Sequence, residues 1–399
     1  FYTSILMESW GYGIMKSMSV MKKNNPEGLR TWIEINRKAV AHNYNIFRKR
    51  IGKNCRLMAV VKSNAYGCGL REFTQTLENL GADWFGVDSI TEALALRSEA
   101  IKKPLLVLGY TMPSRFTDAA HNNISLTVST FQNLKALAAL HTQKPVNVHI
   151  KIDTGMHRQG FFLRDIPAVI RFIKTKKKHI NIEGVYTHLA SAKNPAFPTD
   201  TLKQITAFDQ ALKLFASAGL QPLRHAAATS GMLLYPQSHY DMVRVGIGLY
   251  GLWPSVEVQS VFSGTLHLQP VLSWKTIVSE IKELAAGERI GYDFTEKLAK
   301  DSKIAICPIG YWHGYTRALS SIGRVLVKGK RARVLGRVCM DMLTIDISGI
   351  PNVRIGDTVT LLGHDKNARV SADELAGLSG TTSYETMTRL NPLIKRVCV

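Results

Sequence analysis

Residues 57–62 read Leu57-Met58-Ala59-Val60-Val61-Lys62, an apolar run that ends on a lysine. A short apolar run bounded by polar residues is typical of a strand buried on both faces of a parallel sheet. Amphipathic segments with a period near 3.6 residues, such as 91–97 and 204–216, separate it from similar runs. The runs are 57–61, 84–87, 105–108, 124–128, 146–150, 182–186, 223–227 and 242–246. This alternation predicts an N-terminal (β/α)8 barrel, although a doubly wound open sheet would show the same pattern.

The last third of the sequence has a different texture. After about residue 262, short strands are separated by glycine-containing turns with few helices between them. These strands are expected at 273–282, 304–308, 324–327, 332–338, 343–347 and 358–362. The pattern predicts a mainly β-strand domain at 263–399, after the barrel at 31–262. Residues 1–30 are predicted to be an extension outside the fold, because their first part lacks the pattern of a signal peptide.

The composition favours a cytoplasmic protein without a membrane or nucleic-acid partner. The 399 residues contain no run of the roughly 18 to 20 apolar residues that a membrane span needs. The five cysteines form no CxxC pair, which argues against a disulfide framework and a metal site and fits a reducing compartment. The net charge of +21 would suit a nucleic acid, but the basic residues are scattered. Their densest cluster, 174–178, is expected to be the exposed end of a helix.

Candidate reactive residues follow the predicted strands, because barrel enzymes place their chemistry where the strands end. Lys62 ends the first strand, and a buried amine there suits Schiff-base chemistry with an aldehyde. Its position alone is equally consistent with a lysine that emerges into solvent. Thr229 and Ser230 offer hydroxyls after the seventh strand, and Gly246 and Gly248 after the eighth permit close backbone approach to an anion.

An aldehyde-reactive lysine and a phosphate cradle at the same end of a barrel suggest pyridoxal phosphate as the cofactor. Arg244, on the eighth predicted strand, would then face the pyridine nitrogen, which proteins hold with an arginine or a carboxylate. This combination is more specific than any of its parts, because a GxG pair more often serves to pack a strand against a helix.

The same stretches resemble a known family. Residues 59–69, Ala59-Val60-Val61-Lys62-Ser63-Asn64-Ala65-Tyr66-Gly67-Cys68-Gly69, closely resemble the cofactor-lysine motif of the alanine racemases. Further blocks follow in the expected order at 153–158, 185–188, 243–251, 291–292, 308–311 and 336–341. Because the blocks cover both predicted domains, the chain is identified as a member of the alanine racemase family.

The resemblance implies a homodimeric pyridoxal-phosphate enzyme that interconverts L-alanine and D-alanine and supplies D-alanine for peptidoglycan. It implies a two-base mechanism, in which Lys62 carries the cofactor and serves one face of the substrate. Tyr292, from the partner subunit, would be the base on the opposite face. The cofactor would also be bound by Tyr66, Thr229 and the backbone of Gly246 and Ile247 at its phosphate, by His188 against its ring and by Arg244 at its nitrogen.

The resemblance also assigns the substrate side of the site. Arg158 and the Met340 amide would receive the carboxylate of the amino acid, and Tyr311 would narrow the entrance. Lys151 matches a lysine that is often carbamylated to orient Arg158. An ordinary salt bridge is the alternative role for Lys151.

Several positions depart from the family pattern. Trp312-His313 follows Tyr311 where Ala-Asp is usual, His157 replaces a glycine, and Cys68 replaces a histidine. Pro392 falls where some members carry a phosphate-binding tyrosine, so one anchor is expected to be missing. Alternative functions are a serine or broad-spectrum amino-acid racemase, a non-catalytic pyridoxal-phosphate carrier built from a single barrel, and a decarboxylase of the same fold type.

Overall fold

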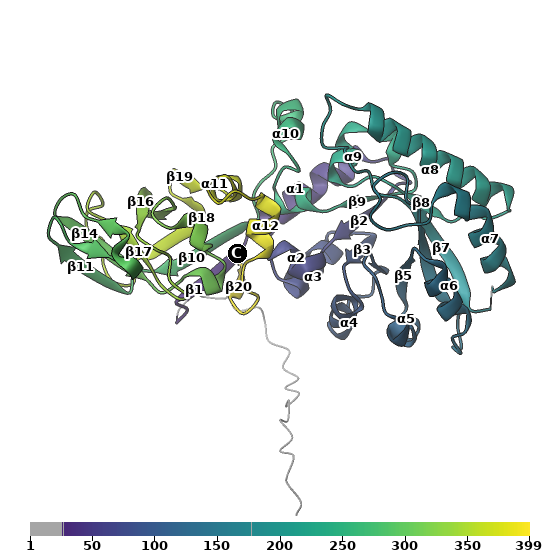
Figure 1. The fold of residues 1–399 in the computed structure, drawn as a ribbon, viewed down its shortest axis with the longest axis horizontal. Coiled ribbons are helices and arrows are strands. Elements are labelled where there is room, and N and C mark those ends of the chain that lie inside the picture. The colour runs from purple at the N-terminus through teal and green to yellow at the C-terminus, as the bar shows by residue number, and fades with distance from the viewer. Residues whose placement is uncertain (1–25, 27, 177) are drawn as a thin grey trace, which may run out of the picture.

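The computed structural model describes residue 26, residues 28–176 and residues 178–399, which form two parts joined side by side (Figure 1). The predicted extension, residues 1–30, lies almost wholly outside the described residues. Within the described chain, no helix has the length and apolar character that crossing a membrane requires.

The first part is an eight-stranded parallel sheet. Its strands are β2 (Arg56–Val60), β3 (Trp84–Val87), β4 (Leu105–Val107), β5 (Ile124–Val128), β6 (Val146–Lys151), β7 (Ile180–Tyr186), β8 (Leu223–His225) and β9 (Met242–Val245). They are ordered β8-β7-β6-β5-β4-β3-β2-β9, so that each strand from β3 to β8 pairs with its predecessor in the chain. All eight predicted runs therefore form strands, with ends that differ by at most two residues.

The two edges of this sheet meet and close it. The backbone N–H of Asp241 donates to the carbonyl of Arg224 (3.0 Å), and that of Arg244 donates to the carbonyl of Ala227 (2.9 Å). On its other side β9 pairs in parallel with β2. The predicted (β/α)8 barrel is confirmed, and the alternative of an open doubly wound sheet is wrong.

Helices surround the barrel, and polar caps start several of them where strands end. They are α1 (Arg37–Arg50), α2 (Lys62–Tyr66), α3 (Leu70–Asn79), α4 (Ile90–Ser98), α5 (Phe116–His121), α6 (Phe131–Ala138), α7 (Ile166–Thr175), α8 (Thr199–Ser217), α9 (Thr229–Leu234) and α10 (Val256–Phe262). The side chains of Ser89 and Thr130 accept hydrogen bonds from the backbone three residues later, at α4 and α6. In the basic cluster, Lys174 lies in the last turn of α7 and Lys176 and Lys178 follow it, and all three are exposed, as predicted.

The second part is a mainly antiparallel sheet, which confirms the predicted β-rich region. Its strands are β1 (Thr31–Ile35), β10 (Leu272–Ile277), β11 (Glu280–Leu284), β14 (Ser302–Cys307), β15 (Arg324–Val327), β16 (Lys330–Leu335), β17 (Leu343–Asp346), β18 (Thr358–Asp365), β19 (Ala368–Val370) and β20 (Lys395–Cys398), beside the small pair β12 (Arg289–Ile290) and β13 (Glu296–Lys297). The single strand expected at 273–282 is wrong: β10 pairs with β1 and β18, whereas β11 pairs with β14. β10 and β11 are therefore separate strands because they pair with different neighbours, although the sequence pattern continues through both.

Both ends of the described chain belong to this second sheet. β1 pairs antiparallel with β10 and parallel with β20, so the described chain passes through the second part before it enters the barrel (Figure 1). The helices α11 (Ala372–Leu378) and α12 (Ser383–Thr388) precede β20, and α12 lies beside α2 of the barrel (Figure 1). The domain boundary predicted after residue 262 coincides with the end of α10, and the division itself stays a prediction.

Candidate active site

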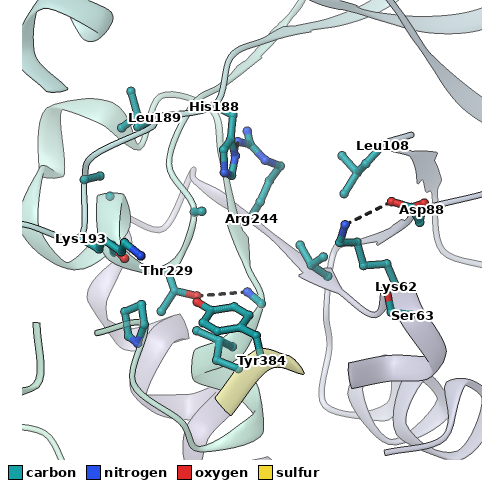
Figure 2. A pocket seen from close by; sticks show the side chains of 18 of the residues that line it. Lys62, Ser63, Asp88, Leu108, His188, Leu189, Lys193, Thr229, Arg244 and Tyr384 are labelled. Carbon is teal, nitrogen blue, oxygen red and sulfur yellow. Dashed lines mark hydrogen bonds and ion pairs between the residues drawn. The ribbon is translucent and has the colours of Figure 1, made fainter. Parts of the chain in front are cut away.

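A cavity of about 800 Å³ opens at the carboxyl ends of the barrel strands. Figure 2 shows Lys62, Arg244 and Thr229 on three sides of it. Of the residues singled out by the sequence, the lining contains Lys62, Tyr66, Lys151, Arg158, His188, Thr229, Arg244, Gly246 and Ile247. Tyr292, Tyr311 and Met340 do not line the cavity of their own chain within the described residues. The structure therefore gathers the barrel candidates and leaves out those of the second domain.

Lys62 begins a turn of unusual backbone. The φ angles of Ser63, Asn64, Ala65 and Tyr66 are 56°, 55°, 49° and 51°, which is left-handed at four successive non-glycine residues. Such conformations are unfavourable for L-residues and collect at functional sites. The Nζ atom of Lys62 lies 3.2 Å from the carboxylate of Asp88, at the end of β3 (Figure 2).

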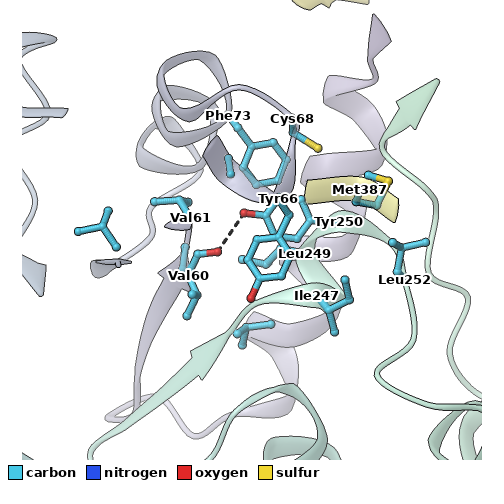
Figure 3. Packing of buried hydrophobic residues seen from close by; sticks show 14 of the residues in the cluster. Val60, Val61, Tyr66, Cys68, Phe73, Ile247, Leu249, Tyr250, Leu252 and Met387 are labelled. Carbon is cyan, nitrogen blue, oxygen red and sulfur yellow. Dashed lines mark hydrogen bonds between the residues drawn. The ribbon is translucent and has the colours of Figure 1, made fainter. Parts of the chain in front are cut away.

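Aromatic packing fixes the strand end that precedes Lys62. The Tyr250 hydroxyl donates to the carbonyl of Val60 at 2.9 Å, and the Tyr250 ring stacks between Tyr66 and Phe73, with both centroid distances 4.5 Å (Figure 3). Burial raises the pKa of Tyr66 to about 12, so its phenol stays protonated and can donate a hydrogen bond. The cluster holds Tyr66 and the carbonyl two residues before Lys62 in one rigid unit.

Arg244 is buried at the floor of the cavity. Its Nη2 atom donates to the carbonyls of Thr187 and Ala226, both at 2.8 Å, and its Nη1 atom donates to Nδ1 of His225 at 2.9 Å. Burial lowers the pKa of Arg244 to about 10, which leaves the guanidinium charged at neutral pH. Burial also holds the pKa of His188 well below its usual value. The second cause is the positive charge of Arg244, whose Nη2 atom lies 3.3 Å from Nδ1 of His188.

A chain of polar side chains inside the barrel continues from Arg244. Because arginine only donates, Nδ1 of His225 accepts, and its Nε2–H therefore donates to Nδ1 of His149 at 2.8 Å. The Nε2 atom of His149 lies 3.4 Å from the carboxylate of Glu183. A Cβ at Gly184 would fall 2.2 Å from the His149 ring, so only glycine admits this ring. None of these residues was predicted from the sequence to belong to the site.

One corner of the cavity suits a phosphate. The Thr229 hydroxyl accepts from the Gly246 N–H at 3.2 Å (Figure 2), and a Cβ at Gly246 would lie 2.7 Å from the Tyr66 hydroxyl. Tyr384 of α12 lines the same cavity, and burial raises the pKa of its phenol. The expected loss of a tyrosine anchor at Pro392 is thus offset, because Pro392 lines a different hollow and Tyr384 occupies this one.

Lys151 and Arg158 bring further positive charge to the cavity. Burial, followed by the charges of Arg244 and Arg158, depresses the pKa of Lys151 well below its usual value. Its Nζ atom lies 4.3 Å above the ring of Tyr186, and no carboxylate within the described chain forms an ion pair with it. The ordinary salt bridge considered for Lys151 is therefore not found. Five lysine or arginine side chains and two carboxylates line the cavity, a balance that favours an anionic ligand.

Comparisons with known proteins show the family of this chain. The model of the alanine racemase N-terminal domain matches residues 35–254, and that of the C-terminal domain matches residues 271–398. The chain belongs to the alanine racemase family. It is 38% identical to an alanine racemase of Symbiobacterium thermophilum over 374 residues (93% of this chain, 97% of the relative), and 39% identical to one of Syntrophobacter fumaroxidans over 357 residues (89% and 94%).

Solved alanine racemases have the same fold. The enzyme of Clostridium difficile 630 superposes with a TM-score of 0.87 at 31% identity, covering 93% of this chain and 96% of that chain. The enzyme of Bacillus anthracis, solved with bound L-Ala-P, has a TM-score of 0.87 at 32% identity, covering 93% and 95%. Because the family match continues through residues 271–398, the single-barrel carrier considered above is not supported.

The family residues of the second domain lie on its surface. Tyr292, Met340 and Tyr311 have relative exposures of 67%, 55% and 42%. The backbone N–H of Tyr311 donates to the carbonyl of Cys339 at 3.0 Å, which ties the Tyr311 turn to the Met340 loop. An ion pair between Arg337 and Asp293 joins the Met340 loop, in which Arg337 lies, to the Tyr292 turn. Three connected loops thus present aromatic and apolar side chains to the outside, a pattern typical of an interface.

Proposed function

We propose that the protein is a pyridoxal-phosphate-dependent alanine racemase. The observation that carries the proposal is the single cavity in which Lys62, Arg244 and the Thr229–Gly246 corner face one another. The names of the relatives, and the bound L-Ala-P of one solved structure, support alanine as the substrate. The basic lining fits both the phosphate of the cofactor and the carboxylate of an amino acid.

Bound pyridoxal phosphate would supply an aldehyde that captures amines and a ring that delocalises the charge left when a Cα proton departs. Lys62 would hold the cofactor and exchange the Cα proton on one face of the substrate. The phosphate would be bound by Thr229, the backbone N–H groups of Gly246 and Ile247, and the hydroxyls of Tyr66 and Tyr384. These phenols remain protonated donors because burial raises their pKa.

Arg244 would donate a hydrogen bond to the ring nitrogen, with His188 against the ring. Its other donors are already fixed by Thr187, Ala226 and His225, so it cannot turn away. An arginine does not readily transfer its proton, which leaves the ring nitrogen unprotonated and limits how far negative charge spreads into the ring. We propose that this favours racemisation over side transamination.

The second base would come from another copy of the chain. Racemisation needs a proton acceptor and a proton donor on opposite faces of one carbon, and Tyr292 does not line the cavity of its own chain. We propose a homodimer in which Tyr292 of the partner subunit serves the second face. The partner's Met340 amide would join Arg158 at the substrate carboxylate, and the partner's Tyr311 would narrow the entrance. The free cysteines are compatible with the proposed cytoplasmic location.

Lys151 is proposed to be carbamylated. Burial and the charge of Arg244 depress its pKa, which favours the neutral amine, the form that reacts with carbon dioxide. The resulting anion would pair with Arg158 and offset the positive charges of Arg244 and Arg158, which act on Lys151 more strongly than the negative charge of Asp153.

The test is a coupled racemisation assay with L-alanine on the wild type and Lys62→Ala. The variant should lose at least about 10³-fold in kcat, since it lacks both the cofactor attachment and one base, and its visible cofactor absorbance should disappear. Lys275→Ala, which breaks an ion pair with Glu34 in the second sheet, is the control and should keep both. Parallel assays with serine, lysine and arginine separate alanine racemase from the broader alternatives; comparable turnover of these would contradict the proposed specificity.

A further inference from the structure

The left-handed turn after Lys62 cannot be explained by its own sequence. Ser63, Asn64, Ala65 and Tyr66 all have positive φ, although none is glycine, and L-residues disfavour this conformation. The backbone hydrogen bonds within the turn, such as that from the Gly67 N–H to the Asn64 carbonyl at 3.0 Å, join only residues that are close in the sequence. Contacts from outside must therefore stabilise it.

The barrel supplies one of these contacts. The Glu92 carboxylate of α4 accepts from the backbone N–H of Asn64 at 3.3 Å and from that of Asp88 at 2.8 Å. Within the turn, the Asn64 side chain accepts from the backbone N–H of Leu70 at 2.9 Å. These bonds hold the start of the turn and its exit into α3.

The second domain supplies the other contact, through Arg396 of β20. Its Nε and Nη2 atoms both donate to the Gly67 carbonyl, at 3.1 and 2.9 Å. Its Nη1 atom donates to the carbonyls of Asn391 (2.8 Å), Pro392 (3.0 Å) and Ile394. The Arg396 side chain is buried, with a relative exposure of 7%. Burial lowers its pKa, and none of the ion pairs found in the described chain involves it. The hydrogen bonds of this buried guanidinium thus all go to backbone carbonyls, while the charge of Glu72 opposes the lowering of its pKa.

The helix before β20 closes on the same point. Gly67 has φ +85°, and a Cβ there would lie 2.1 Å from the carbonyl oxygen of Met387 in α12. The end of the turn is therefore enclosed between α12 on one side and the Arg396 guanidinium on the other. β20 is itself held by parallel pairing with β1. The contacts that Arg396 makes with the turn are therefore anchored in the second sheet.

We propose that Arg396 is a positioning residue that locks the left-handed turn and so aims Lys62 and Tyr66 into the cavity. The proposal rests on the proposed function, since it concerns how the cofactor is captured. Arginine suits the role because its planar fork can place two N–H groups on one carbonyl and still serve others, whereas lysine offers one point charge. Cofactor binding in the barrel then depends on the last strand of the second domain.

The experiment uses the full-length protein stripped of cofactor by dialysis against an amine. Two measurements are made on the wild type and Arg396→Lys: the dissociation constant for added pyridoxal phosphate, and hydrogen exchange at the amides of Gly67, Cys68 and Gly69 before cofactor is added. The matched control is Arg333→Lys, because Arg333 also uses its fork bidentately, on Glu296, but lies in the second domain away from the cavity.

We expect Arg396→Lys to bind the cofactor about tenfold more weakly and to exchange these amides about tenfold faster, an effect of one decade or about 1.4 kcal/mol. Arg333→Lys should lower the thermal midpoint while leaving both readouts at the wild-type values. Arg396→Gln, which keeps an uncharged donor, should lie at or beyond the lysine variant.

If Arg396→Lys leaves both pyridoxal-phosphate affinity and amide exchange unchanged, the proposed positioning role of Arg396 is wrong. Equal changes in the Arg333→Lys control would also contradict it. Failure of both Arg396 variants to fold would also overturn it, because general stability would then be the role of Arg396. If the wild type binds no pyridoxal phosphate, the proposed function fails instead, and the exchange comparison still decides whether Arg396 holds the turn.

Discussion

The barrel cavity buries polar side chains, whereas the loop surface of the second domain, formed by the Tyr292, Tyr311 and Met340 loops, exposes aromatic and apolar ones. In the barrel, Arg244 and Lys151 are buried, and Arg244 donates to the carbonyls of Thr187 and Ala226. In the second domain, Tyr292 is two-thirds exposed although its turn is tied to Arg337. The difference supports the proposal that one copy of the chain builds one side of a reaction site and presents the other side, on its second domain, to a second copy.

The second domain nevertheless also serves its own barrel. Tyr384 of α12 lines the cavity of the same chain, and Arg396 contacts the turn that follows Lys62. The domain therefore has a C-terminal segment that acts within the chain and a loop surface that we propose acts on the partner. The two roles can be separated by asking which variants complement one another in a mixed dimer.

The largest expected effect is complementation between Lys62→Ala and Tyr292→Phe chains. Each variant alone should lose at least about 10³-fold in kcat, because each site then lacks one base. In a mixed dimer, one site would lack both bases and the other would be intact. Random exchange of equal amounts should therefore restore about a quarter of the wild-type activity, measured by racemisation of L-alanine after subunit exchange.

The control for this experiment mixes Lys62→Ala with a Lys62→Ala/Tyr292→Phe chain, which should restore nothing. Absence of recovery from the first mixture, with mixed dimers demonstrated by differently tagged chains, would show that Tyr292 does not act across an interface.

A smaller effect is expected from Tyr384→Phe, which tests the part of the second domain that serves its own chain. Loss of one hydrogen bond to a charged phosphate should weaken pyridoxal-phosphate binding by about 10- to 100-fold, from about 1.5–3 kcal/mol for such a bond. Tyr315→Phe is the matched control, because the Tyr315 hydroxyl is buried in the same domain without a hydrogen-bond partner among the described residues. Equal dissociation constants for the two variants, measured by absorbance titration, would remove Tyr384 from the phosphate site.

Local pattern predicted the fold well, and the reasons are physical. The strands of the barrel are buried on both faces, so each appears as an apolar run, and Lys62 and Arg244 could be placed because barrel chemistry gathers at strand ends. β1 was missed because its partners, β10 and β20, are more than 200 residues away in the sequence. Pairing over such a distance leaves no local signal.

The site was predicted less completely, for a related reason. The family resemblance supplied Tyr292 and Met340, whereas Tyr384 reaches the cavity, and Arg396 reaches the turn after Lys62, only through the return of the C-terminal segment. A usable signal did exist for His149: polar residues at every second position of β6, Asn147, His149 and Lys151, share one face of a buried strand. Its partner His225 lies on β8, and only the closed barrel brings the two rings together.

The smallest effect concerns Lys151 in cofactor-free protein, and its sign depends on carbamylation. Burial depresses the pKa of the folded amine, whereas the unfolded amine titrates near about 10.4. Between these values the unfolded state binds one more proton, so the free energy of unfolding rises with pH, by up to about 1.4 kcal/mol per pH unit. In buffer free of carbon dioxide, Lys151→Met should therefore be more stable than the wild type at pH 7, with a gap that closes toward pH 10.

In bicarbonate the comparison should reverse. A carbamate near Arg158 and Arg244 would stabilise the folded wild type, so that Lys151→Met becomes the less stable protein, as measured by denaturant unfolding at each pH. Lys275→Met, at an ion-paired lysine of the second sheet, should show neither the pH dependence nor the reversal. If the difference in unfolding free energy between Lys151→Met and the wild type changes with neither pH nor bicarbonate, Lys151 is charged and solvated in the folded chain. The barrel cavity would then resemble the exposed surface of the second domain at this point, and the contrast between the two regions would not extend to Lys151.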